Sequence, residues 1–134
     1  MNKMSSLERV VYNILVQANL PFEQEKIFKD CYNGYYRYDL YIPKQQIIFE
    51  INGQQHYEYT KKFYKHRTDF LKAQERDRRK ITYALAHNIK IYCIPYWEIN
   101  NLHNLDDLFN EKFLAHSKFH NDEAYRHQKS KLIK

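Results

Sequence analysis

The chain has 134 residues, and its 43% hydrophobic and 16% aromatic residues supply enough apolar surface for one domain with one core. Lysine and arginine number 22 against 16 aspartate and glutamate residues, so the formal net charge is +6. This charge suits a polyanionic partner, and it equally suits a soluble protein that is basic without one.

Cysteine usage and hydropathy exclude several classes. Cys31 and Cys93 are the only cysteines and lack CxxC spacing, so neither a zinc site nor a disulfide framework is indicated, and reduced core thiols are expected. No apolar run approaches the ~18 residues of a membrane span, and the stretch MNKMSSLERV lacks the apolar segment of a signal peptide. A cytoplasmic protein without membrane contact is therefore expected.

The first predicted element is a helix within residues 5–20. Ser5 and Glu8 form a capping-box pattern at its start, and Pro21 stops it. Five apolar residues recur at helical spacing and predict its buried face: Leu7, Val10, Val11, Ile14 and Leu15.

Three strands are predicted next, in residues 22–32, 35–43 and 45–52. The pair Asn33-Gly34 between the first two is typical of a two-residue hairpin turn, and Asn52-Gly53 closes the third strand. In the second strand, alternation places Tyr36, Tyr38, Leu40 and Ile42 on one face, and Arg37, Asp39 and Tyr41 on the other. In the third strand, Ile47, Phe49 and Ile51 oppose Ile48 and Glu50.

The second half reads as a long basic helix over about residues 61–88, a fourth strand at residues 89–95 and a closing helix at residues 104–116. Residues 117–134 are polar and basic without a clear period, and they predict a partly ordered tail. We therefore expect one α+β domain over residues 1–116. Its fourth strand is placed beside a three-strand antiparallel meander by a helical crossover.

Asp39 and Glu50 occupy the two most strand-like segments, where a charge is costly to bury. An antiparallel partner can bring two such carboxylates within several ångströms, and their repulsion and burial both raise their pKa values unless a cation is present. Carboxylates with water and phosphate as the other ligands describe a magnesium site for phosphodiester cleavage. On two carboxylates alone, an alternative stays open in which Asp39 pairs with Arg37 or another basic side chain and Glu50 faces solvent at a strand edge.

Four segments in order resemble the PD-(D/E)XK nuclease superfamily: RYDLYIP, IIFEINGQQHY, QERDRRK and IKIYCIPYWE. Within it, the chain is most similar to very short patch repair (Vsr-like) endonucleases and to phage EDxHD homing endonucleases. The resemblance spans residues 7–98 and implies a restriction-endonuclease-like core. It also implies that Asp39 and Glu50 ligate Mg²⁺ or Mn²⁺, with Glu8, or else Glu25, as the additional acidic residue.

The sequence departs from the family pattern at Asn52, which stands where the motif has lysine and cannot supply a positive charge. The EDxHD pattern suggests His56 as the catalytic replacement and Asp77 as its last acidic residue. Lys80 is expected to make ion pairs on a solvated helix face, with a relocated motif lysine as the alternative. Asn52, Gln54 and Gln74 are further accessory candidates.

The resemblance implies a Mg²⁺-dependent endodeoxyribonuclease that leaves 5′-phosphates, with double-stranded DNA as partner. The alternatives are a non-catalytic nucleic-acid-binding module on the same fold and an interaction protein of a phage or mobile element. Homing, repair and restriction roles stay open, as do a homodimer and a partner protein. Basic side chains of the long helix and the segment before it are expected to contact phosphates: Lys61, Lys62, Lys65, Arg67, Lys72, Arg76, Arg78 and Arg79.

Overall fold

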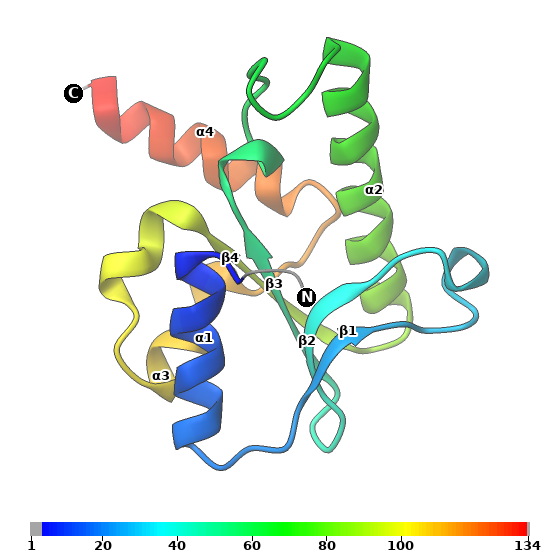
Figure 1. Ribbon diagram of the computed structural model, residues 1–134, viewed down its shortest axis with the longest axis vertical. Coiled ribbons are helices and arrows are strands. Elements are labelled where there is room, and N and C mark those ends of the chain that lie inside the picture. The colour runs from blue at the N-terminus through cyan, green and yellow to red at the C-terminus, as the bar shows by residue number, and fades with distance from the viewer. Residues whose placement is uncertain (1–3, 134) are drawn as a thin grey trace.

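A four-stranded mixed sheet lies between two layers of helices (Figure 1). The structure is a computed structural model that describes residues 4–133, with the side chains of residues 4–132. The helices and strands are α1 Ser6–Gln17, β1 Glu23–Lys26, β2 Tyr38–Ile42, β3 Ile47–Asn52, α2 Arg67–Ala86, β4 Lys90–Pro95, α3 Leu105–Leu108 and α4 His120–Ile133. Four short 3-10 turns accompany them: η1 Tyr32–Gly34, η2 Gln54–His56, η3 Tyr96–Asn101 and η4 Glu111–Phe113. The predicted α+β class is confirmed.

The sheet has the order β1-β2-β3-β4. The first three strands pair antiparallel, as the predicted meander requires, and β4 pairs parallel with β3. Helix α2 makes the crossover between β3 and β4, which is the connection that a parallel pair needs. Every residue of β3 is buried because helices cover both faces of the sheet.

Two apolar cores flank the sheet, and both use the alternation along β3. Phe49 and its neighbours Ile47 and Ile51 pack under α1, whereas Ile48 packs against α2. The buried stripe of α1 was the predicted one, except that Val10 is only partly buried. Within residues 4–133, no helix combines the length and apolarity that crossing a bilayer requires.

Helix α1 begins as its sequence predicts. The Ser5 hydroxyl oxygen accepts a hydrogen bond from the Glu8 backbone N–H at 3.1 Å and caps the helix. The Glu8 carboxylate completes no capping box, and among the described residues it makes no hydrogen bond or ion pair. That carboxylate is therefore free to interact within a small hollow that it lines together with Glu25 and Asp39.

The predicted two-residue hairpin at Asn33-Gly34 is wrong. Residues 27–37 separate β1 from β2, and Tyr32, Asn33 and Gly34 all adopt positive φ within the short turn η1. Cys31, predicted in a strand, instead lies in this loop, buried with its thiol 3.7 Å from the Tyr38 hydroxyl. The Asn-Gly pair does form a tight turn, but the core contact of Cys31 keeps the chain from pairing directly around it.

Two predicted helices are shorter than expected. The long helix begins at Arg67 rather than near residue 61, because the Asp69 carboxylate accepts the His66 backbone N–H and caps the helix there. The helix predicted at residues 104–116 breaks into α3 and η4. Asn110 is the cause, since its side-chain oxygen accepts the Lys112 N–H at 3.1 Å and starts a new turn.

The segment predicted as a partly ordered tail forms helix α4, which packs on the same face of the sheet as α2 (Figure 1). Polar contacts hold it: Arg78 of α2 pairs with both carboxylate oxygens of Asp122, at 3.1 and 3.2 Å. Tyr125 donates a hydrogen bond to Glu58 and stacks on Tyr57. Because these contacts are mostly polar, apolar periodicity could not reveal them.

Replacing Phe49 tests the core beneath α1. This fully buried ring packs against Tyr92 and Phe109, so Phe49→Ala should lower the free energy of unfolding by about 3–5 kcal/mol in a urea titration. Leu71→Ala, on the exposed side of α2, should change it by less than ~0.5 kcal/mol. Equal effects of the two substitutions would contradict this assignment of the core.

Candidate active site

Strands β2 and β3 separate where Asp39 faces Glu50. Their ladder runs from Ile42 to Leu40, which pairs with Phe49, and it stops there. Beyond it, the Asp39 carboxylate accepts the Ile51 backbone N–H at 2.7 Å. A side chain thus satisfies a donor at the strand separation, which fixes the direction of the Asp39 carboxylate.

The neighbouring strand is also irregular here. Glu25 is the register partner of Asp39 on β1, yet the pair is missing from the ladder and Glu25 has a φ of 55°. The predicted alternation of β2 fails at the same place, since Tyr38 packs with Tyr41 on the α2 side instead of with Leu40. The alternation prediction assumed a regular strand, and the irregularity at Asp39 breaks it.

The two carboxyl groups perturb each other. Burial, followed by the neighbouring charge of Glu50, raises the pKa of Asp39 well above its usual range. Burial also raises the pKa of Glu50, although the Lys80 charge opposes that shift. The pair therefore holds a proton more readily than two separate carboxyl groups do.

Lys80 belongs to this site, and its predicted place on a solvated face is wrong. Its Nζ lies 2.7 Å from Glu50 Oε1, and the two side chains are only 12% and 8% exposed. Burial alone would lower the pKa of Lys80, but Glu50 and Asp39 raise it above the ordinary value, so the ammonium stays charged. Its backbone carbonyl accepts the Tyr38 hydroxyl at 2.8 Å, which ties this turn of α2 to β2.

Helical spacing contains the signal for Lys80. Ala73, Asp77, Lys80 and Ala84 stand at i, i+4, i+7 and i+11, which is one face of α2. Ala73 and Ala84 on that face are buried. A lysine and an aspartate on such a stripe need partners, and this spacing is the sequence signal that puts both on the inward face of α2.

His56 and Asp77 form the second part of the site. His56 Nδ1 lies 2.8 Å from Asp77 Oδ2, which brings η2 against α2 and joins two residues that the EDxHD pattern suggests separately. An ionised aspartate carboxylate can only accept, so Nδ1 carries a proton, and in the neutral imidazole Nε2 is the acceptor. Asp77 also lines a small cavity with Glu50 and Lys80, so it connects the histidine to the carboxylates.

Glu8 and Glu25 approach the site from the other side. Both line one small hollow with Asp39 and Ile51. Glu25 also lies 3.9 Å from Arg37 in an exposed ion pair, whereas Glu8 lacks such a partner among the described residues. Among the described residues, Glu25 thus has an ion-pair partner and Glu8 does not, although both side chains line the hollow.

The accessory candidates lie around this centre, and α4 joins them. Asn52 is buried and donates to Asn121 of α4 at 3.3 Å, so the residue in place of the motif lysine contacts a helix. Gln74 lines a hollow with His56 and Asp77, but Gln54 pairs with Glu58 instead. Asn121 was not predicted as a residue of this site, because its helix, α4, was not predicted.

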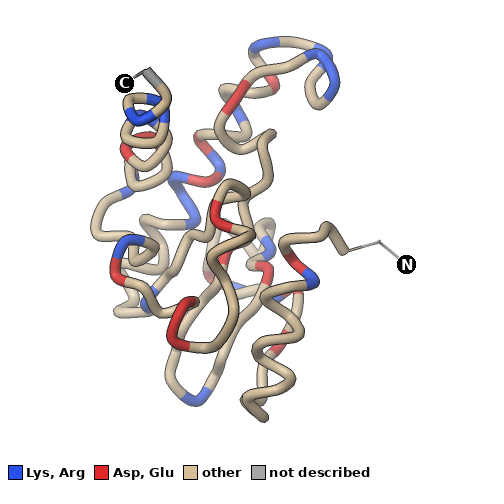
Figure 2. The backbone as a smooth tube through the Cα atoms, turned by 90° about the vertical axis from the view of Figure 1, so that its left-hand side faces the viewer, with Lys and Arg blue, Asp and Glu red and all other residues tan. Residues whose placement is uncertain are grey.

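The predicted phosphate-contacting residues divide into two groups. Arg78 is engaged by Asp122 and Glu75, and Arg79 contacts Glu75 and the Tyr36 hydroxyl. The other six are exposed: Lys61, Lys62, Lys65, Arg67, Lys72 and Arg76. Figure 2 shows basic residues gathered on the loop at the N-terminal end of α2.

Two of these carboxylates fit a cation of the magnesium type. Within residues 4–133, no three histidine, cysteine, aspartate or glutamate side chains enclose a metal position. Mg²⁺ needs only one or two protein carboxylates and keeps water and substrate phosphate as its other ligands. Glu50 Oε1 is buried and forms no aligned hydrogen bond with a described residue, despite the nearby Lys80 Nζ, so it retains acceptor capacity. Asp39 and Glu50 are the residues that would hold the ion.

Comparisons with protein-family models, with curated proteins and with solved structures found no match to this chain. The resemblance to PD-(D/E)XK nucleases therefore rests on the quoted residues.

Asp39→Asn should stabilise the fold at neutral pH. An acid whose pKa is raised by folding loses stability as pH rises from its unfolded value, near 4, toward its folded value. The amide keeps an oxygen for the Ile51 N–H but carries no charge. We expect a gain of about 1 kcal/mol at pH 7 that shrinks toward pH 4, measured by urea unfolding. A gain that grows toward low pH would contradict this.

Lys80→Met should destabilise the fold by about 3–5 kcal/mol at pH 7, because it leaves the buried Glu50 carboxylate without its cation. Thermal and urea unfolding measure the loss, and Lys72→Met on the exposed side of α2 is the matched control. Adding Glu50→Gln to Lys80→Met should restore most of the stability. A double variant as unstable as the single one would show that the ion pair is not the cause.

Proposed function

We propose that this protein is a Mg²⁺-dependent endonuclease that hydrolyses phosphodiester bonds in DNA and leaves 5′-phosphates. One observation carries the proposal: at the separation of β2 and β3, Asp39 faces Glu50, and a charged lysine lies 2.7 Å from Glu50. Burial raises the pKa of both carboxyl groups, and the charge of Glu50 raises that of Asp39 further; such perturbed groups are costly to the fold and concentrate at functional sites. The resemblance to PD-(D/E)XK nucleases assigns these same two carboxylates to the metal.

His56 would serve as the general base. Asp77 holds the proton on Nδ1, so Nε2 can take a proton from the attacking water. The same contact orients the ring and stabilises the imidazolium that forms. Asp77, the partner of this histidine, lines a small cavity with Glu50, which supports a role for His56 near that carboxylate.

Lys80 would supply the positive charge that the motif lysine provides elsewhere. Asn52 fills the motif position on β3, and Lys80 approaches Glu50 from α2 instead. A fixed ammonium stabilises the negative charge that develops on the phosphate, and its burial makes this effect larger than in water. A bound divalent cation, held by Asp39 and Glu50, would polarise the phosphate.

The exposed lysines and arginines before and along α2 would bind the phosphate backbone. They lie at the end of the molecule that carries the N-terminus of α2 (Figure 2). Such contacts give salt-dependent affinity without reading sequence. Because one chain carries one proposed cleavage site, a monomer would nick double-stranded DNA. A double-strand break would need a second copy or a partner.

A non-catalytic nucleic-acid-binding module is the second candidate. Asn52 in place of the motif lysine favours it, as does the Lys80 ammonium beside the Glu50 oxygen that a metal would need. Such a module would bind DNA through the same exposed basic residues, and its binding would be indifferent to Asp39.

Plasmid cleavage distinguishes the two functions. Supercoiled plasmid with Mg²⁺ or Mn²⁺ should be nicked by the wild-type protein and left intact in EDTA. Asp39→Asn should abolish cleavage, and His56→Ala should slow it by about a hundredfold or more. His103→Ala, an exposed histidine far along the chain, is the control that should cleave normally. Intact plasmid under every metal, with salt-sensitive binding unchanged in Asp39→Asn, would establish the binding module instead.

A further inference from the structure

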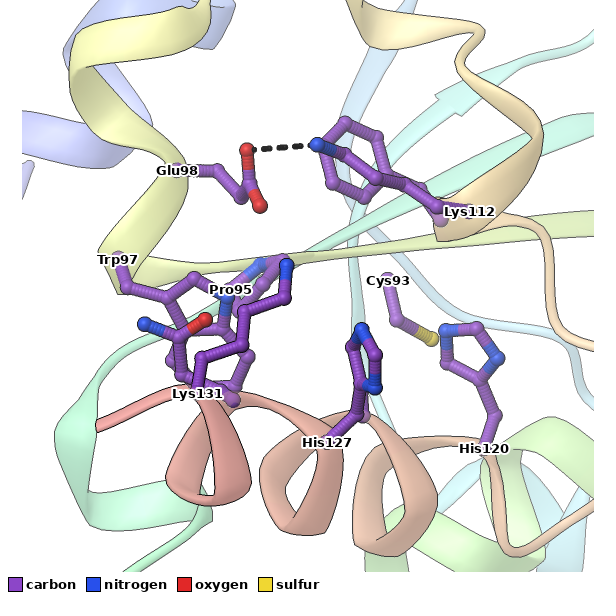
Figure 3. A pocket seen from close by; sticks show the side chains of 11 residues that line it. Cys93, Pro95, Trp97, Glu98, Lys112, His120, His127 and Lys131 are labelled. Carbon is purple, nitrogen blue, oxygen red and sulfur yellow. Dashed lines mark ion pairs between the residues drawn. The ribbon is translucent and has the colours of Figure 1, made fainter. Parts of the chain in front are cut away.

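A second cavity, of about 170 Å³, lies between α4 and the segments that follow β4 (Figure 3). Cys93, Pro95 and Phe113 are buried and form its apolar floor, and Trp97 stands at one side. Typical pockets for drug-sized ligands measure roughly 300–1,000 Å³, so this one suits a single flat ring system. The proposed cleavage chemistry uses none of these side chains.

The rim of this pocket is basic. Glu98 is its one carboxylate, and Lys112 Nζ and the Asn101 amide nitrogen both lie 3.0 Å from its Oε1, so its charge is paired. Lys131 stands on α4 over the pocket and has no ion-pair partner among the described residues, so a positive charge is left over. The same face of α4 also presents His127 (Figure 3).

Polar groups for a heterocycle are present beside the apolar floor. Burial lowers the pKa of His120, so its imidazole is neutral at pH 7 and offers one donor and one acceptor. Gln128 adds an amide with both functions. An aromatic side chain next to such groups is the usual arrangement for holding a base by stacking and edge hydrogen bonds.

We propose that this pocket binds a nucleoside monophosphate, with its base against Trp97 and its phosphate at Lys131. The ligand would be flat at one end and anionic at the other. The apolar floor and Trp97 match the flat end. Lys131 matches the anionic end, because the charge of Glu98 is already paired with Lys112. Cys93 pairs with Glu50 across the sheet and lines both this pocket and the small cavity beside Lys80. The bound nucleotide would thus lie one strand away from the proposed cleavage site.

Trp97 is the only tryptophan of the chain, so its indole N–H gives a single resonance in a nitrogen–proton correlation spectrum. Adenosine monophosphate or thymidine monophosphate, added to the full chain, should shift this resonance saturably. Adenosine alone and inorganic phosphate alone should each bind more weakly, because each has only one of the two groups.

Lys131→Gln should weaken monophosphate binding by about fivefold and leave adenosine binding unchanged, as expected for one charge pair near the surface. Lys129→Gln makes the same charge change on the same helix, but Lys129 lies over the Tyr125 ring and does not line the pocket. It should bind normally. Equal losses in both variants, or no saturable shift with any nucleotide, would overturn the proposal.

A free nucleotide and a strand end carry the same chemistry. A short oligonucleotide with a 5′-phosphate should displace the monophosphate if strand ends are the natural ligand, and an oligonucleotide without it should not. Failure of both oligonucleotides to compete would assign the pocket to the free nucleotide. Binding by the cleavage-deficient Asp39→Asn variant separates this inference from the proposed nuclease: it should be unchanged even if plasmid cleavage is never observed.

Discussion

The buried ion pair between Lys80 and Glu50 is the interaction on which the arrangement of this molecule depends. It joins the middle of the sheet to the crossover helix, and both partners are almost excluded from water. A buried ion pair often contributes little net stability, because two charges must lose their hydration. The carboxylate of Asp77 lies near Glu50 and adds to the cost of keeping it ionised, and the charge of Glu50 does the same to Asp39. Hydrophobic residues of similar volume could fill the same space, so the fold does not need these charges to join the sheet to the helix.

Near this ion pair, strands β1 and β2 depart from regular geometry, and polar side chains lie where they do so. The ladder between β2 and β3 ends so that Asp39 can accept the Ile51 N–H, and Glu25 on β1 takes a positive φ beside it. Helix α4 then closes the outer side, with Asn121 reaching Asn52 and Asp122 holding Arg78. These irregularities concentrate at one end of the sheet, while the core beneath α1 is regular and apolar.

Much of this arrangement could be predicted because its signals are local. Helical spacing fixed the buried stripe of α1, and alternation fixed the two faces of β3, since both periods follow from backbone geometry. The carboxylates of Asp39 and Glu50 came together as antiparallel pairing suggests. The family pattern suggested His56 and Asp77 as site residues but not their pairing, because no local period brings a turn after β3 against the crossover helix.

The failures share a physical cause, which is tertiary contact between polar groups. Apolar periodicity does not predict α4, because hydrogen bonds and an ion pair hold this helix in place. These contacts involve Arg78, Asp122 and Tyr125. Lys80 was predicted on a solvated face because a lysine side chain usually lies there, whereas its position on the inward face of α2 buries it against Glu50. The Asn33-Gly34 turn exists, but the contact of Cys31 with Tyr38 decides how the chain leaves it.

The placement of Lys80 has a consequence for how the molecule forms. Glu50 belongs to β3 and Lys80 to the helix that links β3 to β4, so the two meet only when that helix has packed on the sheet. Parallel pairing across such a connection is slow, because chain entropy is lost before the contacts reward it. An incompletely folded chain therefore holds exposed carboxylates without their lysine. The arrangement of charges around Glu50 is complete only in a chain whose crossover helix has packed on the sheet.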